Sequence, residues 1–166
     1  LTQVGRRPLT IVCAPAGYGK SILMSAWLEQ CDCHSAWLSL DKNDNDLGAF
    51  ESYLLAALHT AIPTLDHELM TILGGTRLPP KSVFVEMLFD ALSRIEYDVL
   101  LMIDDYGVIT NDDIHELIVE LMRHPHPKLH LILGTRYNPP LPLSEWRVRD
   151  QLIEIRSIDL RFSLEE

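Results

Sequence analysis

Short apolar runs alternate with longer helical segments along most of the chain. Most of the runs are apolar at successive positions, as expected for strands buried on both faces of a sheet. Strands separated by helical crossovers pair in parallel and carry helices on both sides. The predicted strands are residues 9–14, 34–40, 99–103, 129–133 and 152–155. We therefore predict an α/β fold with a mainly parallel, five-stranded central sheet.

The segments between these strands place apolar residues at helical spacing. Asn111 is a typical N-cap residue, so one helix is expected to start there and to run to about residue 122. The other predicted helices are residues 21–30, 47–62 and 82–95. Polar residues 41–46 and the Gly- and Pro-containing stretch 73–80 are expected to be loops. A chain of 166 residues suits one domain.

The composition narrows the functional classes. The chain is 47% hydrophobic and 23% charged, as in ordinary soluble domains. Its formal net charge of −10 makes it a poor candidate for binding nucleic acid directly, because phosphate contacts need clustered Lys and Arg. No apolar run approaches the length that spans a bilayer, and no signal peptide opens the sequence. A cytoplasmic protein without a membrane partner is expected.

The most informative motif is APAGYGKS at residues 14–21, between a predicted strand and a predicted helix. Small residues let the backbone curl so that successive N–H groups point at phosphate oxygens, and the following helix adds the positive end of its dipole. Lys20 is expected to reach the β- and γ-phosphates, and the Ser21 hydroxyl to ligate Mg²⁺. This is a phosphate-binding loop, or P-loop, although Ala14 replaces its usual first glycine. The expected nucleotide contacts are Pro15, Ala16, Gly17, Tyr18, Gly19, Lys20 and Ser21.

A second acidic site follows the apolar run of residues 99–103. Asp104 is expected to hold Mg²⁺, and Asp105, one residue on, to orient or deprotonate an attacking water. The alternative is a strand that ends in a solvated acidic turn. Asp105 is one methylene shorter than the Glu often found in this role, so we expect slow hydrolysis at most.

The fourth predicted strand ends in LGTR, with Arg136 just beyond it. If the sheet has the order 5-1-4-3-2, this strand lies between the P-loop strand and the acidic strand. Arg136 then emerges beside the γ-phosphate, where a guanidinium can detect that group and its loss. The expected catalytic residues are thus Lys20, Asp105 and Arg136, with Ser21 and Asp104 as magnesium ligands.

Cysteines give less information. Cys13 lies in an apolar run and is expected to be buried. Cys31, Cys33 and His34 form a C-x-C-H cluster, but no second Cys/His pair at suitable spacing completes a metal site. Structural cysteines are the alternative, and the sequence leaves their role open.

In order along the chain, the segments RRPLTIVCAPAGYGKS, SAWLSLDKNDND, LLMIDDY, LILGTRYNPPLPL and QLIEIRSIDLRFSLEE resemble one family. It is the nucleotide-binding domain of the signal-transduction NTPases with numerous domains, in particular the MalT-like, LuxR-type bacterial transcription regulators. The resemblance implies a P-loop NTPase three-layer α/β/α sandwich and an adenine base. It also implies that Arg136 occupies the family's sensor position.

The same resemblance implies a larger parent protein. In such proteins a winged helix, a helical-repeat sensor and often a DNA-binding helix-turn-helix follow this domain, and the ATP-bound form self-associates. A capping box at residues 163–166 (SLEE) predicts a further helix, so residues 1–166 are expected to be one domain of a longer regulator. Any DNA contact would then lie outside these residues.

Three functional hypotheses follow. The leading one is an ATP-binding switch domain with slow, Mg²⁺-dependent hydrolysis in a transcription regulator. The second is a module that binds ATP or ADP without turnover. The third is a small-molecule phosphotransferase, which the lack of an Arg-rich lid after the acidic strand disfavours.

Overall fold

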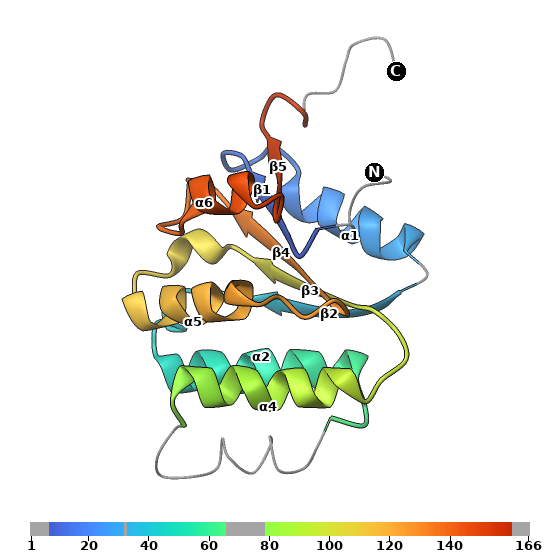
Figure 1. Cartoon of the computed structure of the whole chain (residues 1–166). Helices are drawn as coiled ribbons and strands as arrows, with labels where there is room; N and C mark the ends of the chain where they lie inside the picture. The colour runs from blue at the N-terminus through green and yellow to red at the C-terminus, as the bar shows by residue number, and fades with distance from the viewer. Residues whose placement is uncertain (1–6, 32, 66–78, 161–166) are drawn as a thin grey trace.

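The computed structural model of the chain describes residues 7–31, 33–65 and 79–160. It contains one five-stranded sheet with the order β2-β3-β4-β1-β5, in which every neighbouring pair is parallel (Figure 1). The predicted parallel sheet and the predicted order 5-1-4-3-2 are both confirmed. The strands are β1 (Leu9–Cys13), β2 (His34–Ser39), β3 (Val99–Asp104), β4 (Leu129–Thr135) and β5 (Leu152–Arg156).

Helices cover both faces of this sheet, which confirms the predicted three layers. Helix α1 lies on one face, while α2, α4 and α5 lie on the other (Figure 1). The predicted helices are α1 (Lys20–Gln30), α2 (Leu47–Ala61), α4 (Lys81–Ser93) and α5 (Asp112–Arg123). Two short elements were not predicted: the 3₁₀ turn η1 (Tyr106–Val108) and helix α6 (Leu143–Val148).

The core follows the period of two along each strand. In β1, Ile11 points into the larger core beneath α2, α4 and α5, whereas Val12 points to α1. In β3, Ile103 and Met102 divide between the same two faces. The inner strands β1, β3 and β4 are buried on both faces along most of their length, so they form the apolar runs seen in the sequence, whereas the edge strands β2 and β5 are partly exposed.

Several boundaries differ from the sequence prediction by one or two residues. Strand β3 includes Asp104, β4 extends to Thr135, and α1 begins at Lys20. These ends are set by pairing and packing with neighbouring elements, which apolar patterning does not report. The capping-box segment 163–166 and most of the predicted loop 73–80 lie outside the described residues.

Side chains cap two of the helices at their N-termini. Asn111 accepts a hydrogen bond from the Asp113 amide at 2.9 Å, which confirms the predicted cap of α5. Asp46 accepts from the Ala49 amide at 2.9 Å and ends the polar loop before α2. Among the helices that the structure describes, none combines the length and the apolarity needed to cross a membrane.

Candidate functional site

The loop between β1 and α1 curls at two glycines. Gly17 has φ +82° and Gly19 has φ +73°, both in the left-handed region. A Cβ at either position would meet no atom within 4 Å, so the backbone conformation, not crowding, requires glycine here. Gly19 is the N-cap of α1, and no side chain caps this helix end. The first-turn amides of α1 therefore remain available to an anion.

Lys20 is buried at the start of α1, with 7% of its surface exposed. Its ammonium donates hydrogen bonds to the carbonyl oxygens of Ala14 at 2.8 Å and Pro15 at 3.2 Å. These contacts hold the Lys20 ammonium against the first residues of the loop between β1 and α1.

Ser21 and Asp104 meet although they lie 83 residues apart in sequence. The Ser21 hydroxyl donates to Oδ2 of Asp104 at 2.5 Å, and Oδ1 of Asp104 accepts from the Asp105 amide at 2.8 Å. A hydroxyl beside a carboxylate is a pair of oxygen donors of the kind that Mg²⁺ prefers.

Gly134 on β4 makes this position of Asp104 possible. A Cβ on Gly134 would lie 2.6 Å from Oδ1 of Asp104 and 3.1 Å from Sδ of Met24. The backbone of β4 thus approaches the carboxylate closely, as only glycine permits. Gly134 was not predicted as a site residue, although a glycine inside an apolar strand is a recognised sign of close approach.

Asp105 and Arg136 lie together beyond the ends of β3 and β4. Asp105 adopts a left-handed conformation with φ +54°, and Nη2 of Arg136 is 3.7 Å from its Oδ1. Both side chains are about half exposed. The structure therefore brings the two predicted residues side by side, at the same edge of the sheet as Ser21 and Asp104.

A cavity of about 490 Å³ opens beside this pair, lined by both residues and by the loop between β2 and α2. Lys42 and Asn45 supply that loop's part of the wall. Residues 41–46 were predicted only as a polar loop, and neither Lys42 nor Asn45 was predicted as a site residue. These two residues line the cavity because the strand order brings their loop beside the ends of β3 and β4. The composition of the loop does not indicate this position.

Directly after Asp105, the chain is anchored in the core. The hydroxyl of Tyr106, which is fully buried, lies 2.7 Å from Nδ1 of His115 on α5. Burial lowers the pKa of His115, and the nearby Asp112 carboxylate opposes that shift. The contact between Tyr106 and His115 thus anchors the segment after Asp105 to helix α5.

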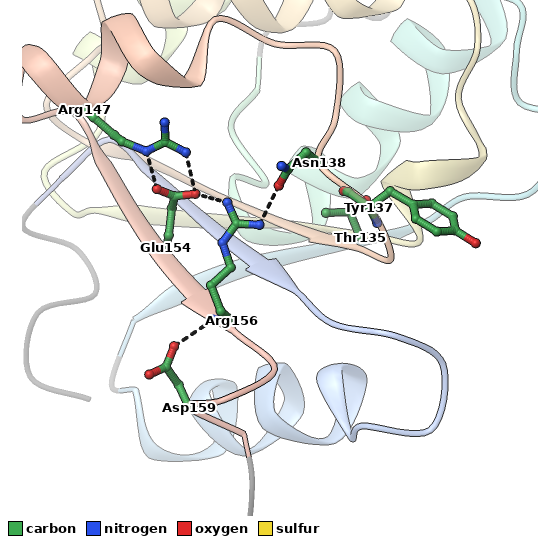
Figure 2. A network of polar contacts seen from close by, with 7 residues as sticks. All are labelled: Thr135, Tyr137, Asn138, Arg147, Glu154, Arg156 and Asp159. Carbon is green, nitrogen blue, oxygen red and sulfur yellow. Dashed lines mark hydrogen bonds and ion pairs between the residues drawn. The ribbon is translucent and has the colours of Figure 1, made fainter.

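A polar network between β5, α6 and Asn138 holds the loop that follows Arg136 (Figure 2). Arg156 at the end of β5 donates to Oδ1 of Asn138 at 2.5 Å and also contacts Glu154. Arg147 of α6 donates to Glu154 as well, and this hydrogen bond lowers the pKa of the Glu154 carboxyl. Tyr137 points away from this network in Figure 2 and is 73% exposed.

The paired cysteines have a structural role, which was the alternative to a metal site. Cys31 and Cys33 form a disulfide between α1 and β2, while Cys13 is free and buried as predicted. Over residues 7–31, 33–65 and 79–160, no group of three or more His, Cys, Asp and Glu side chains could hold a metal.

The chain matches no known family model. Along its full length, however, it is similar to proteins named HTH-type transcriptional regulator MalT. The protein from Yersinia enterocolitica serotype O:8 / biotype 1B is 38% identical over 167 residues, and that from Serratia proteamaculans is 39% identical over 166 residues. The chain is homologous to a segment of the MalT-type regulators. It spans 18% of the length of each of these two relatives.

Solved structures agree on the fold. The structure of Drosophila ORC bound to AT-rich DNA and Cdc6 superposes with a TM-score of 0.59 at 12% identity, covering 94% of this chain and 50% of the other. The crystal structure of Cdc6p from Pyrobaculum aerophilum gives a TM-score of 0.56 at 13% identity, covering 89% and 38%. At such identities the likeness concerns the fold alone, and it agrees with the predicted three-layer α/β/α sandwich.

Proposed function

We propose that the chain binds ATP with Mg²⁺ and hydrolyses it slowly, as the switch domain of a bacterial transcription regulator. The observation that carries this proposal is the contact between Ser21 and Asp104 beside the curled loop that holds Lys20. A phosphate cradle, a cation and a pair of oxygen donors thus converge at one edge of the sheet. The homology to MalT-type regulators supports the regulatory role.

The residues present fit the nucleotide and its metal. The glycine-dependent curl and the first-turn amides of α1 suit phosphate oxygens, and Lys20 exchanges its two carbonyl partners for the β- and γ-phosphates. Ser21 and Asp104 would hold Mg²⁺, directly or through water. When bound, Mg²⁺ neutralises charge that develops on the phosphate oxygens.

Asp105 and Arg136 supply the remaining chemistry. Their 3.7 Å ion pair is half exposed, so the two side chains can separate at small cost. Arg136 then turns to the γ-phosphate, and Asp105 is released to orient the attacking water and accept its proton. Binding of ATP would thereby separate Arg136 from Asp105, whereas with ADP the two side chains would stay in their ion pair.

DNA binding belongs, on this proposal, to regions of the parent protein outside this chain. A domain with a net charge of −10 is not suited to hold DNA. We infer that DNA is bound elsewhere in the parent protein, that this domain acts in the cytoplasm, and that the ATP-bound parent self-associates.

Replacing Asp105 with Asn tests the hydrolytic part of the proposal. Asn cannot accept the proton, so phosphate release should fall about 100-fold while the affinity for Mg-ATP changes by less than about threefold. Phosphate release and equilibrium binding are measured on the same preparations, with Asp90→Asn on the exposed face of α4 as the control.

Unchanged phosphate release in Asp105→Asn would contradict the role given to that carboxylate. Binding without any release by the unsubstituted chain and by its full-length parent would favour the alternative, a nucleotide-binding module without turnover.

A further inference from the structure

The cavity beside Asp105 and Arg136 adjoins the proposed nucleotide site on the side away from the P-loop. None of residues 15–21 lines it, whereas Lys42 does. A γ-phosphate cradled at Lys20 and approached by Arg136 would face this cavity. The cavity is therefore a place from which a further side chain could reach the terminal phosphate.

The charges in the cavity favour an anion. Arg136 is paired with Asp105, so these two largely neutralise each other. Lys42 adds a positive charge, and its side chain takes part in no ion pair within the portions of the chain that the structure describes. The chain has a net charge of −10, so a cation at the cavity wall with no ion-pair partner among the described residues suits a negatively charged ligand.

Asn45 fixes the backbone that presents Lys42. Its side-chain amide donates to the carbonyl oxygens of Lys42 and Val108, each at 3.1 Å. Its Oδ1 accepts from the amides of Thr110 at 2.6 Å and Asn111 at 3.2 Å. One side chain thus ties the β2–α2 loop to the segment after Asp105, so the cavity wall is preorganised.

We propose that Lys42 contacts the terminal phosphate of ATP and is a specificity-determining residue that favours ATP over ADP. This inference rests on the proposed function and extends it. ADP lacks the γ-phosphate, so Lys42 contributes to the binding of ATP alone. In addition to Lys20 of the P-loop, two cations from different loops then contact the γ-phosphate, Arg136 beyond β4 and Lys42 beyond β2.

The test is calorimetric titration of Mg-ADP and of a Mg-bound non-hydrolysable ATP analogue into the unsubstituted chain and Lys42→Met. The variant should bind the analogue about tenfold more weakly, because a charge-assisted contact is lost, and ADP with an affinity changed less than twofold. Lys42→Arg should restore most of the preference for the analogue. Arg123→Met removes an exposed charge from the end of α5 and should change neither affinity.

The outcomes separate the two proposals. If the unsubstituted chain binds both nucleotides and Lys42→Met affects neither, or weakens both equally, the role of Lys42 is overturned and the proposed function stands. If the unsubstituted chain binds neither nucleotide, the proposed function is overturned and this inference with it.

Discussion

Gly134 shows how a single residue sets the geometry of the acidic strand end. The Asp104 carboxylate lies against the β4 backbone, where it accepts from the Asp105 amide and from Ser21. The 2.6 Å separation that a Cβ would have from Oδ1 leaves no room for any other residue. Since the carboxylate is also fixed by its partners, it cannot move away without losing hydrogen bonds.

We predict that Gly134→Ala displaces the Asp104 carboxylate and lowers the unfolding free energy by about 1–3 kcal/mol, as overpacking in a close contact does. Chemical denaturation measures the stability. The variant should also lose the Mg²⁺ dependence of nucleotide binding, because the two oxygen donors no longer lie together.

Gly107→Ala is the matched control for this change. A Cβ there would lie 3.0 Å from the Thr135 hydroxyl and 3.6 Å from the Arg136 amide nitrogen, so this change also crowds the end of β4 but makes no contact with Asp104. Equal stability and equal Mg²⁺ dependence in Gly134→Ala and the unsubstituted chain would show that the carboxylate does not depend on this glycine.

Among the elements, helix α2 carries a group that the nucleotide site does not use. Glu51 is fully buried, and neither of its carboxyl oxygens has a hydrogen-bond partner among residues 7–31, 33–65 and 79–160. Burial raises its pKa from the ordinary 4.5 to about 7, although the Lys81 ammonium on α4 partly opposes the shift. Lys81 is itself paired with Asp113 and Glu116 of α5.

This raised pKa makes stability depend on pH. Between about pH 4.5 and pH 7, the folded state retains the Glu51 proton that the unfolded chain releases. The stabilisation that the protonated Glu51 contributes is therefore fully present below the pKa of Glu51 in the unfolded chain. It is lost as pH rises through the pKa of Glu51 in the folded state.

Glu51→Gln should remove this dependence. Relative to the variant, the unsubstituted chain should lose about 2 kcal/mol of unfolding free energy between pH 5 and pH 8. Urea denaturation at several pH values measures it, with the exposed Glu86→Gln on α4 as the control. Parallel pH profiles for the chain and Glu51→Gln would mean that Glu51 titrates as an exposed carboxyl does.

Most helices and strands that the structure describes could be predicted from the sequence. All five strands and four helices were predicted because their apolar periodicity reflects burial on each face. Helix α6 was missed because six residues after a Pro-rich stretch give too short a pattern. The hydrogen bonds of Asn45 join two loops that are distant in sequence, and single-residue preferences do not encode such contacts.

At the scale of the molecule, the strand order explains why the candidate site forms. With β1 and β3 on either side of β4, the carboxyl ends of the three strands lie at one edge of the sheet (Figure 1). Asp104 ends β3, Arg136 follows β4 and Lys20 follows the loop after β1, so all three belong to that edge. The sequence predicted these residues because each follows a recognisable apolar run. Lys42 belongs to a loop whose partners are set only by the assembled fold, so no apolar run or motif beside it indicates its position.

Nucleotide binding through the P-loop is the central claim, and titration of Mg-ATP into the chain and into Lys20→Ala tests it most directly. We predict saturable binding to the unsubstituted chain and to Lys128→Ala, a control at the opposite edge of the sheet, with at least about tenfold weaker binding to Lys20→Ala. Circular dichroism should show all three proteins folded. Equal affinity of the chain and Lys20→Ala for Mg-ATP, or no binding to either, would contradict the claim.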